Sequence, residues 1–403
     1  MQPVIKEPLA PSRPVVITVL GIGQILAWGS SYYLLTVLAR PVAEATGWPT
    51  QWVFGALSIG LLVSGLVSPR VGHLIEQYGG RPVLAGSAVL LAAGLAVQAT
   101  APNVAVFVLA WLLIGVAMGA GLYDPAFSAL TRLYGEQARS AITNLTLWGG
   151  FASTVCWPFS AFLVERFGWR GANLVYVAIH LGLVLPMYWF GLPRETVRPP
   201  QPPARTESVP RATRRENRFL FVVLATCFTL SSVSMTVMAV HLIDVLQTSG
   251  LTLATAVSLG MLIGPSQVGA RVLEAAFGRR FHPIWSLLVS TVAVAIGLGT
   301  LLGSLELIAI GLILYGGGNG IRSIARGTVP LAMFGREGYA VLMGWLALPV
   351  LVAQAVSPSI GDVMIQHLGV DGMIAVLVAV SVLNVAATAA LMPIALRRGV
   401  VAG

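Results

Sequence analysis

Apolar stretches of 18 or more residues, bounded by charged residues or by Pro and Gly, recur along almost the whole chain. A transmembrane helix needs about 20 such residues, so a chain of 403 residues has room for roughly a dozen crossings with short connectors. The stretches lack the two-residue alternation of membrane β-strands, and helices are therefore predicted. With 56% hydrophobic and only 10% charged residues, the composition excludes a soluble enzyme and leaves no sizeable extramembrane domain.

The apolar stretches predict an all-α membrane protein with twelve transmembrane helices. These cover residues 15–39, 51–71, 83–101, 104–130, 141–165, 172–192, 219–243, 253–277, 284–302, 306–328, 339–363 and 372–396. One polar stretch, residues 193–218, separates the first six from the last six and contains seven arginines and several prolines. We expect an N-terminal six-helix bundle over residues 1–192, a flexible Pro/Arg-rich linker over 193–218, and a C-terminal six-helix bundle over 219–403.

Short segments of the two halves echo each other at an offset close to 200. Residues 133–137 read LYGEQ and residues 333–337 read MFGRE, while Pro158 has a counterpart in Pro358. These matches share one register with the division into six and six spans, which indicates an internal duplication. Two pseudo-symmetric bundles around a cleft at the membrane midplane are typical of transporters.

Basic residues concentrate in the connectors on the linker's side of the membrane. They are Lys6, Arg13, Arg70, Arg81, Arg132, Arg139, the seven linker arginines, Arg279, Arg280, Arg336, Arg397 and Arg398, against Arg40, Arg166 and Arg170 on the other side. Because cytoplasmic connectors carry the excess of Lys and Arg, we expect both termini on the cytoplasmic side of a plasma (inner) membrane. The net charge of +9 thus reflects topology, and no aromatic-interleaved basic face points to nucleic acid.

The loop after the second span carries Gly72, Glu76, Gly79 and Arg81. This pattern resembles the loop signature of the major facilitator superfamily (MFS), and the resemblance extends over nearly the whole chain. Gly72 allows two helices to approach closely, Glu76 can cap a helix or pair across the bundle, and Arg81 can bind helix C-terminal carbonyls or an acid. We interpret the loop as a conformational latch; the alternative is that Arg81 is only an interfacial anchor.

A weaker resemblance is to the monocarboxylate and oxalate-formate carriers, on residues 78–83 (YGGRPV), residues 239–243 (AVHLI) and Arg271. In those carriers an arginine of the eighth span contacts the carboxylate, which implies this role for Arg271, although its position seven residues before Gly278 predicts a place near the inner surface. Many proton-coupled drug exporters of the superfamily have an arginine where this chain has Trp111, so a standard exporter is disfavoured.

Charged residues inside the spans each cost about 2.5 to 3.5 kcal/mol on insertion scales and therefore invite functional hypotheses. Asp124 precedes Pro125 in the fourth span, and Asn319, Arg322 and Arg326 follow the glycines of the tenth. The MFS resemblance implies that these two helices converge at the cytoplasmic end of the cleft. We expect Asp124 to pair with Arg322 or Arg326 as an inner gate. The alternatives are an ordinary helix-end acid and arginines that snorkel to the surface.

The first span places Gln24, Trp28 and Tyr32 one turn apart, and the MFS resemblance puts this helix beside the cleft, so these three are expected to contact the substrate. Cys156 and Cys227 lie in apolar segments and cannot build a metal site or a disulfide framework. No phosphate-binding loop ending in Lys and Ser or Thr appears in the sequence. We expect no cofactor, no metal and no enzymatic activity.

The chain is accordingly interpreted as a monomeric secondary transporter, a symporter or antiporter, that moves a small solute through the lipid bilayer by alternating access. The first candidate substrate is a small organic anion or monocarboxylate-like metabolite held by Arg322 or Arg271. A second candidate function is proton-coupled efflux of amphipathic compounds with Asp124 as the proton carrier. A third is a non-transporting membrane sensor on the same fold.

Overall fold

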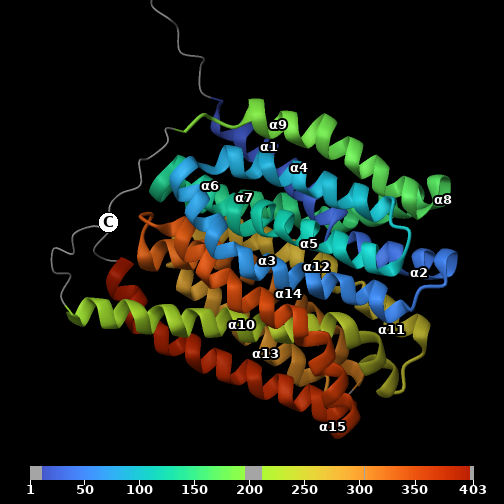
Figure 1. The fold of residues 1–403 in the computed structure, drawn as a ribbon. Coiled ribbons are helices and arrows are strands. Elements are labelled where there is room, and N and C mark those ends of the chain that lie inside the picture. The colour runs from blue at the N-terminus through green and yellow to red at the C-terminus, as the bar shows by residue number, and fades with distance from the viewer. Residues whose placement is uncertain (1–10, 196–210, 304, 400–403) are drawn as a thin grey trace, which may run out of the picture.

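A computed structural model describes residues 11–195, 211–303 and 305–399, and the long regular elements in these ranges are helices. Figure 1 shows them running side by side, with the first half (blue to green) and the second half (yellow to red) on opposite sides of the bundle. In chain order they are α1 (Arg13–Ser30), α2 (Leu34–Thr46), α3 (Thr50–Tyr78), α4 (Gly80–Ala99), α5 (Val104–Gly121), α6 (Tyr123–Tyr134), α7 (Ala138–Gly150), α8 (Ala152–Ile179), α9 (Leu185–Gly191), α10 (Arg211–Thr248), α11 (Leu253–Gly260), α12 (Ile263–Phe277), α13 (Pro283–Thr300), α14 (Ile308–Phe334) and α15 (Tyr339–Gly399).

Nine helical stretches in the described part of the chain are long and apolar enough to cross a membrane. Two of them hold more than one crossing. Val104–Gly191 has 88 residues with turns at Gly135 and Gly168, and Tyr339–Arg398 has 60 residues with a turn at Gly369. With three crossings in the first of these, two in the second and one in each of the other seven stretches, the structure agrees with twelve spans.

The turn glycines repeat the internal duplication in three dimensions. Gly135 and Gly335 have φ values of 56° and 77°, and Gly168 and Gly369 have φ values of 67° and 72°. Residues with a side chain rarely adopt this left-handed region, so each glycine permits the turn that joins two spans. The two glycines of each pair lie close to 200 residues apart, which is the offset of the sequence matches between the halves.

Four predicted spans are not continuous helices, which corrects the sequence analysis. The backbone leaves helical geometry at Ser31, between α1 and α2, and at Leu122, between α5 and α6. The helical hydrogen-bond pattern is also interrupted at Phe151, between α7 and α8, and at residues 261–262, between α11 and α12, where the backbone stays in the right-handed helical region. At Leu122 the cause is local, because the carbonyl of Gly121 would bond to the amide of residue 125, and Pro125 has none. Broken membrane helices commonly mark a transporter's binding site.

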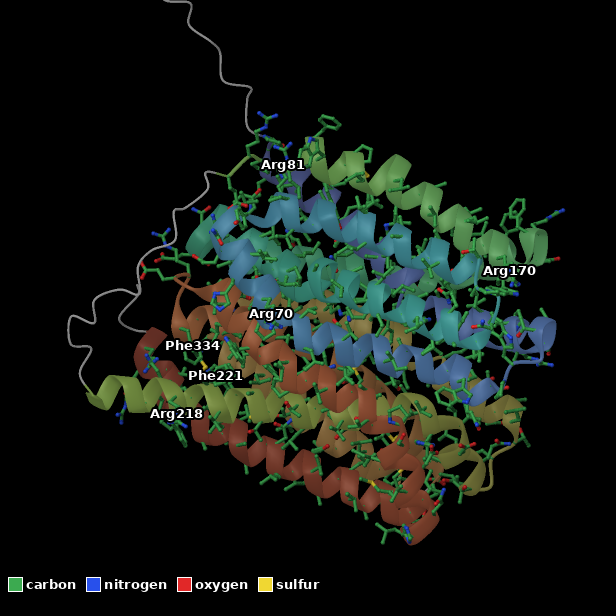
Figure 2. All side chains as sticks on the ribbon, viewed as in Figure 1. Arg70, Arg81, Arg170, Arg218, Phe221 and Phe334 are labelled. Carbon is green, nitrogen blue, oxygen red and sulfur yellow. The ribbon has the colours of Figure 1, made fainter. Side chains whose placement is uncertain are left out.

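The predicted linker is too long at its C-terminal end. Helix α10 already begins at Arg211, where the sequence continues with helix-forming Ala, Arg and Glu, so residues 211–218 are helical. Residues 196–210, the middle of the predicted linker, lie outside the described ranges. We call the end of the bundle where α9 ends and α10 begins the linker end. Figure 2 shows Arg81 and Arg218 at the linker end and Arg170 at the opposite end.

Helix α3 of the first half packs tightly against α15 of the second. The Cα of Gly72 faces the carbonyl of Ala340, and that of Gly344 faces the carbonyl of Ser68, so a Cβ at either glycine would collide with backbone. The close helix approach expected at Gly72 is therefore present, and it joins the two halves rather than two helices of one bundle.

Candidate functional site

A cavity of about 110 Å³ lies between the two halves. Its lining combines three arginines, one carboxylate, four aromatic rings and several amide or hydroxyl groups. The polar and aromatic members are Trp28, Tyr32, Tyr33, Ser64, Ser68, Tyr123, Asp124, Gln267, Arg271, Asn319, Arg322, Ser323, Arg326 and Gln354. Trp28, Tyr32, Asp124, Asn319, Arg322 and Arg271 are thus brought to one cavity from positions far apart in the sequence.

Gln24, expected to contact substrate, lies behind this cavity and supports its wall. Its side chain is fully buried, and its Nε2 donates to the carbonyl of Gly121 over 2.7 Å. This is the carbonyl left without a helical donor by Pro125. The Gln24 Oε1 accepts a hydrogen bond of 3.1 Å from Trp28 Nε1, so the same amide also orients an aromatic ring that lines the cavity.

Replacing Gln24 with Leu is expected to lower the free energy of unfolding by about 1–3 kcal/mol, because the buried Gly121 carbonyl loses its partner. Thermal unfolding in detergent measures the effect. The matched control is Gln98→Leu, since Gln98 is also fully buried but neither side-chain polar atom has a hydrogen-bond partner in the described structure. Equal stability of the Gln24 variant and the wild type would contradict the role assigned to Gln24.

Asp124 and Arg326 form an ion pair between the halves. Asp124 lies in the first turn of α6, where the helix dipole favours a carboxylate. Arg326 Nε lies 2.9 Å from Oδ1, and its Nη2 lies 2.6 Å from Oδ2, which is a bidentate arrangement. Each side chain is 15% exposed. Of the two arginines considered as partners of Asp124, the structure pairs it with Arg326.

Arg322 lies one turn before Arg326 on α14 and is 6% exposed. Its Nε is 3.4 Å from Asn319 Oδ1, and its Nη2 contacts the sulfur of Met235, a weak acceptor. The Asn319 amide in turn donates to the carbonyl of Tyr315 over 2.9 Å. Among the described residues, no carboxylate forms an ion pair with Arg322, so its charge faces the cavity without a counter-charge.

Arg271 is buried in the cavity wall, 6% exposed, and not near the inner surface as its sequence position predicted. Its three nitrogens donate to the carbonyls of Thr146 and Gly320, at 3.1 and 3.4 Å, and to Ser323 Oγ at 3.2 Å. The cause of the burial is the glycine face of α14. At Gly320 a Cβ would collide with the backbone of Gln267, and this close approach carries α12 into the cavity wall.

Two residues from elsewhere in the first half contact the loop after α3, and the sequence analysis did not identify them as its partners: Arg132, near the end of α6, and Glu195, which follows α9. Arg132 Nε lies 2.6 Å from Glu195 Oε2, its Nη1 lies 3.8 Å from Glu76 Oε1, and it also donates to the Glu76 carbonyl. The other Glu195 oxygen accepts from the amide of Gly80 over 2.8 Å, at the first turn of α4. Glu195 thereby ties the start of the predicted linker to the loop after α3.

Arg81 makes a different contact from the carbonyl or carboxylate interactions expected of it. Its guanidinium lies 4.7 Å from the centre of the Trp189 ring, a cation–π geometry that attaches α4 to α9. Gly79, with φ of 88°, makes the turn between α3 and α4. The loop residues therefore hold the first half together around Arg132 and Glu195, while Gly72 contacts α15.

A sequence profile of the Major Facilitator Superfamily matches residues 20–281, which is more than half of the chain. The chain belongs to the major facilitator superfamily. A mouse protein named monocarboxylate transporter 11 is 30% identical over 164 residues, which cover 38% of this chain and 35% of that protein. The match thus spans about a third of the relative's length.

Two solved structures show that this MFS protein has the fold of the superfamily. The human organic anion transporter superposes with a TM-score of 0.73 at 17% identity, covering 94% of this chain and 100% of that one. The E. coli fucose:proton symporter superposes with a TM-score of 0.71 at 15% identity, covering 93% and 98%. The predicted all-α MFS fold and the predicted resemblance to monocarboxylate carriers are confirmed. The chain is an integral membrane protein of this superfamily.

In this MFS protein the hydrogen bonds between the halves gather toward the linker end. Arg139 donates to the carbonyls of Gly278 and Phe281 over 2.7 and 2.8 Å. The Asp124–Arg326 pair lies closer to the cavity and lines it. Arg271 adds its bond to Thr146. These contacts join the two halves on the linker side of the cavity.

Proposed function

We propose that this MFS transporter carries a small organic anion, which binds between Arg322 and Arg271 in the central cavity. The observation that carries the proposal is the excess of positive charge in the cavity lining. Three arginines line the cavity with a single carboxylate, Asp124, and that carboxylate forms an ion pair with Arg326. A buried charge without a partner is unfavourable, and an anionic substrate supplies the missing counter-charge. Arg322 also presents a planar fork of donors, which suits a carboxylate.

The aromatic wall supports a small substrate with an apolar portion. Trp28 lies 5.5 Å from Tyr32 and 5.3 Å from Tyr123 between ring centres, so the rings form one continuous surface in the cavity that also holds the arginines. A carboxylate at Arg322 would place its carbon skeleton against these rings. The volume of about 110 Å³ favours a compact acid over the amphipathic compounds of the efflux alternative.

The names of similar proteins agree with this substrate class. The mouse relative is named a monocarboxylate transporter, and the human structural neighbour is an organic anion transporter. The fucose:proton symporter shares the fold with a neutral sugar as substrate, so the fold alone does not select an anion. The selection rests on Arg322 and Arg271.

The Asp124–Arg326 pair acts in this proposal as the gate on the linker side of the cavity. By the positive-inside rule that side is cytoplasmic, in a plasma (inner) membrane with both termini inside. The six-helix bundles over residues 1–192 and 219–403 would rock about the cavity while the pair opens and closes. A proton that neutralises Asp124 would weaken the pair and couple transport to a proton gradient.

Thermal unfolding of the purified protein in detergent tests the substrate class. The panel contains small carboxylates, sugars, amino acids and lipophilic cations at two pH values. A ligand that binds only the folded state at 100 times its Kd stabilises it by about 2.7 kcal/mol, and we expect this from carboxylates. Stabilisation by lipophilic cations alone, strongest at high pH, would support proton-coupled efflux and contradict the anion proposal.

A further inference from the structure

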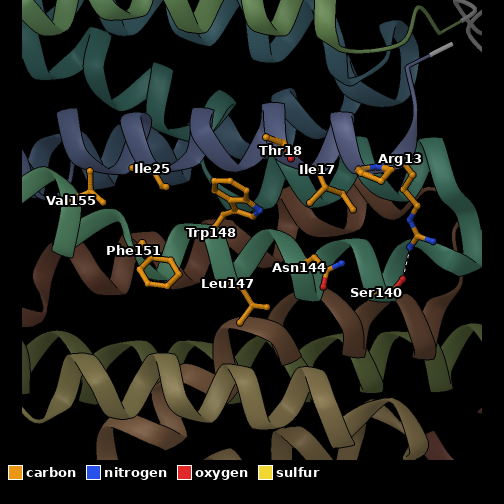
Figure 3. Close-up of a pocket in the computed structure, with 11 residues that line it drawn as sticks. Arg13, Ile17, Thr18, Ile25, Ser140, Asn144, Leu147, Trp148, Phe151 and Val155 are labelled. Carbon is orange, nitrogen blue, oxygen red and sulfur yellow. Dashed lines mark hydrogen bonds between the residues drawn. The ribbon is translucent and has the colours of Figure 1, made fainter. Parts of the chain in front are cut away.

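A second and larger hollow, of about 770 Å³, lies outside the central cavity as a groove between α1 and α7. Figure 3 shows the two helices with side chains from both pointing into the space between them. The groove extends past α7 to the start of α8. Its lining is Arg13, Pro14, Ile17, Thr18, Ile25, Ser140, Asn144, Leu147, Trp148, Phe151 and Val155.

The groove is polar at one end and apolar at the other. Arg13, Ser140 and Asn144 gather at its linker end, and Ile25, Phe151 and Val155 line its other end (Figure 3). Phe151 and Val155 are 47% and 48% exposed, so the apolar end is open to the outside of the bundle. In a membrane protein that outside is lipid.

The length of the groove matches one leaflet of a bilayer. From Arg13 to Ile25 helix α1 advances by about 18 Å at 1.5 Å per residue. Half of the hydrocarbon core of a bilayer is about 15 Å thick. A chain that starts at Arg13 would therefore follow the groove to about the midplane of the membrane.

Arg13 has donors and charge left for an anion at the mouth of the groove. Its Nη2 donates to the carbonyl of Gln137 and to Ser140 Oγ, and its guanidinium lies 5.1 Å from the centre of the Tyr134 ring. The Nε is buried and so is not accessible to a ligand, whereas Nη1 donates to none of the described groups and is the nitrogen left for an anion. No carboxylate in the described ranges forms an ion pair with Arg13.

We propose that this groove is a lipid site, in which one acyl chain of an anionic phospholipid lies along α1 and α7 and its phosphate binds Arg13. An apolar slot alone would accept the tail of any lipid. The unpaired guanidinium at the membrane surface selects a negative headgroup, because basic residues near the surface attract anionic lipids. The site is separate from the substrate cavity, so the inference does not depend on the proposed substrate.

The experiment uses the full chain in phosphatidylcholine vesicles that contain increasing fractions of phosphatidylglycerol with brominated acyl chains. Bromine quenches nearby tryptophan fluorescence, and Trp148 in the groove is the reporter. Its contribution is isolated by comparison with Trp148→Phe. We expect saturable quenching at low phosphatidylglycerol fractions, and brominated phosphatidylcholine at the same fractions should quench Trp148 far less.

Two variants and one control distinguish the contribution of the phosphate contact at Arg13 from that of the acyl-chain contact in the groove. Arg13→Gln should raise the half-saturating fraction about fivefold, the equivalent of ~1 kcal/mol for one basic residue near an anionic surface. Thr18→Phe keeps the charge of Arg13 but fills the groove, and it should also weaken quenching. Arg218→Gln removes a charge at the same end of the bundle, on α10, and should change nothing.

Equal quenching by the two brominated lipids, or an unchanged half-saturating fraction in both Arg13→Gln and Thr18→Phe, would overturn the proposal. A third arm uses a brominated fatty acid. We expect unlabelled phosphatidylglycerol to displace it from the groove. If the fatty acid binds and phosphatidylglycerol does not displace it, the occupant is a free fatty acid and the phospholipid assignment is wrong.

Discussion

Replacing Arg322 with Gln is expected to weaken binding of the carboxylate substrate by about 10- to 100-fold, because a hydrogen bond to a charged group contributes about 1.5–3 kcal/mol. Arg322 is buried, and none of the described carboxylates pairs with it, so its contribution is not shared with a resident acid. The affinity is measured by ligand-dependent thermal shift with the carboxylate that stabilises the wild type most. The variant itself should fold, because it removes an uncompensated buried charge.

Two further variants define what Arg322 supplies. Arg322→Lys keeps the charge but loses the planar fork, and we expect an intermediate affinity. Arg70→Gln removes an exposed arginine of α3 and serves as the control for net charge (Figure 2). An Arg322→Gln variant that binds the carboxylate as tightly as Arg70→Gln would remove the basis for the anion site.

Replacing Asp124 with Asn is expected to open the linker side of the cavity. Removing one partner of a fully buried ion pair costs about 3–5 kcal/mol. For this partly buried pair we expect a smaller cost, and it falls on the state in which the pair is closed. We therefore expect at least about a tenfold rise in labelling of a buried cysteine placed next to the gate on its linker side. Ser128→Cys is a suitable reporter because Ser128 is 2% exposed and faces a small hollow between α6 and α15.

The labelling experiment needs a background without the buried native cysteines, Cys156 and Cys227. The matched control exchanges the charges, as Asp124→Arg with Arg326→Asp, which restores an ion pair and should return labelling toward the wild-type rate. A labelling rate that does not change in Asp124→Asn would mean that the pair does not hold the linker side closed.

Hydropathy was sufficient to predict the spans, because the cost of exposing polar backbone to lipid dictates helices of this length. The superfamily was predicted from the resemblance of the loop after the second span to the MFS signature. Hydropathy did not predict where helices break. The break at Leu122 depends on Pro125, three residues later, and on Gln24, which binds the Gly121 carbonyl from 97 residues away in the sequence. Continuous apolar composition on both sides of Leu122 conceals the break.

The part of the candidate site that could be predicted is the part that follows from the depth of each residue in its membrane span. Asp124, Arg322 and Arg326 lie at similar depths in two helices that the family pattern brings together, so a pair was expected. The choice between the arginines depends on about 6 Å of rise along α14, which sequence alone does not resolve. Arg271 was placed too near the surface because the glycine face of α14 was not recognised as the packing surface for α12.

Glu195 could have attracted attention as one of only 15 acids in the chain, near the start of the predicted linker. Its partner Arg132 was counted only as an interfacial charge. The contact joins residues 63 positions apart, and no local pattern marks it. Such contacts between helix ends become visible only once the packing of the helices is known.

Counterflow in proteoliposomes tests the central claim most directly. Vesicles with purified protein are loaded with an unlabelled small carboxylate, and entry of the same labelled acid is followed with time. We expect rapid accumulation of label with the wild type and at least a tenfold slower rate with Arg322→Gln, while Arg70→Gln behaves as the wild type. Accumulation at the same rate in all three proteins, or none with the wild type for any carboxylate of the panel, would contradict an anion carrier built around Arg322.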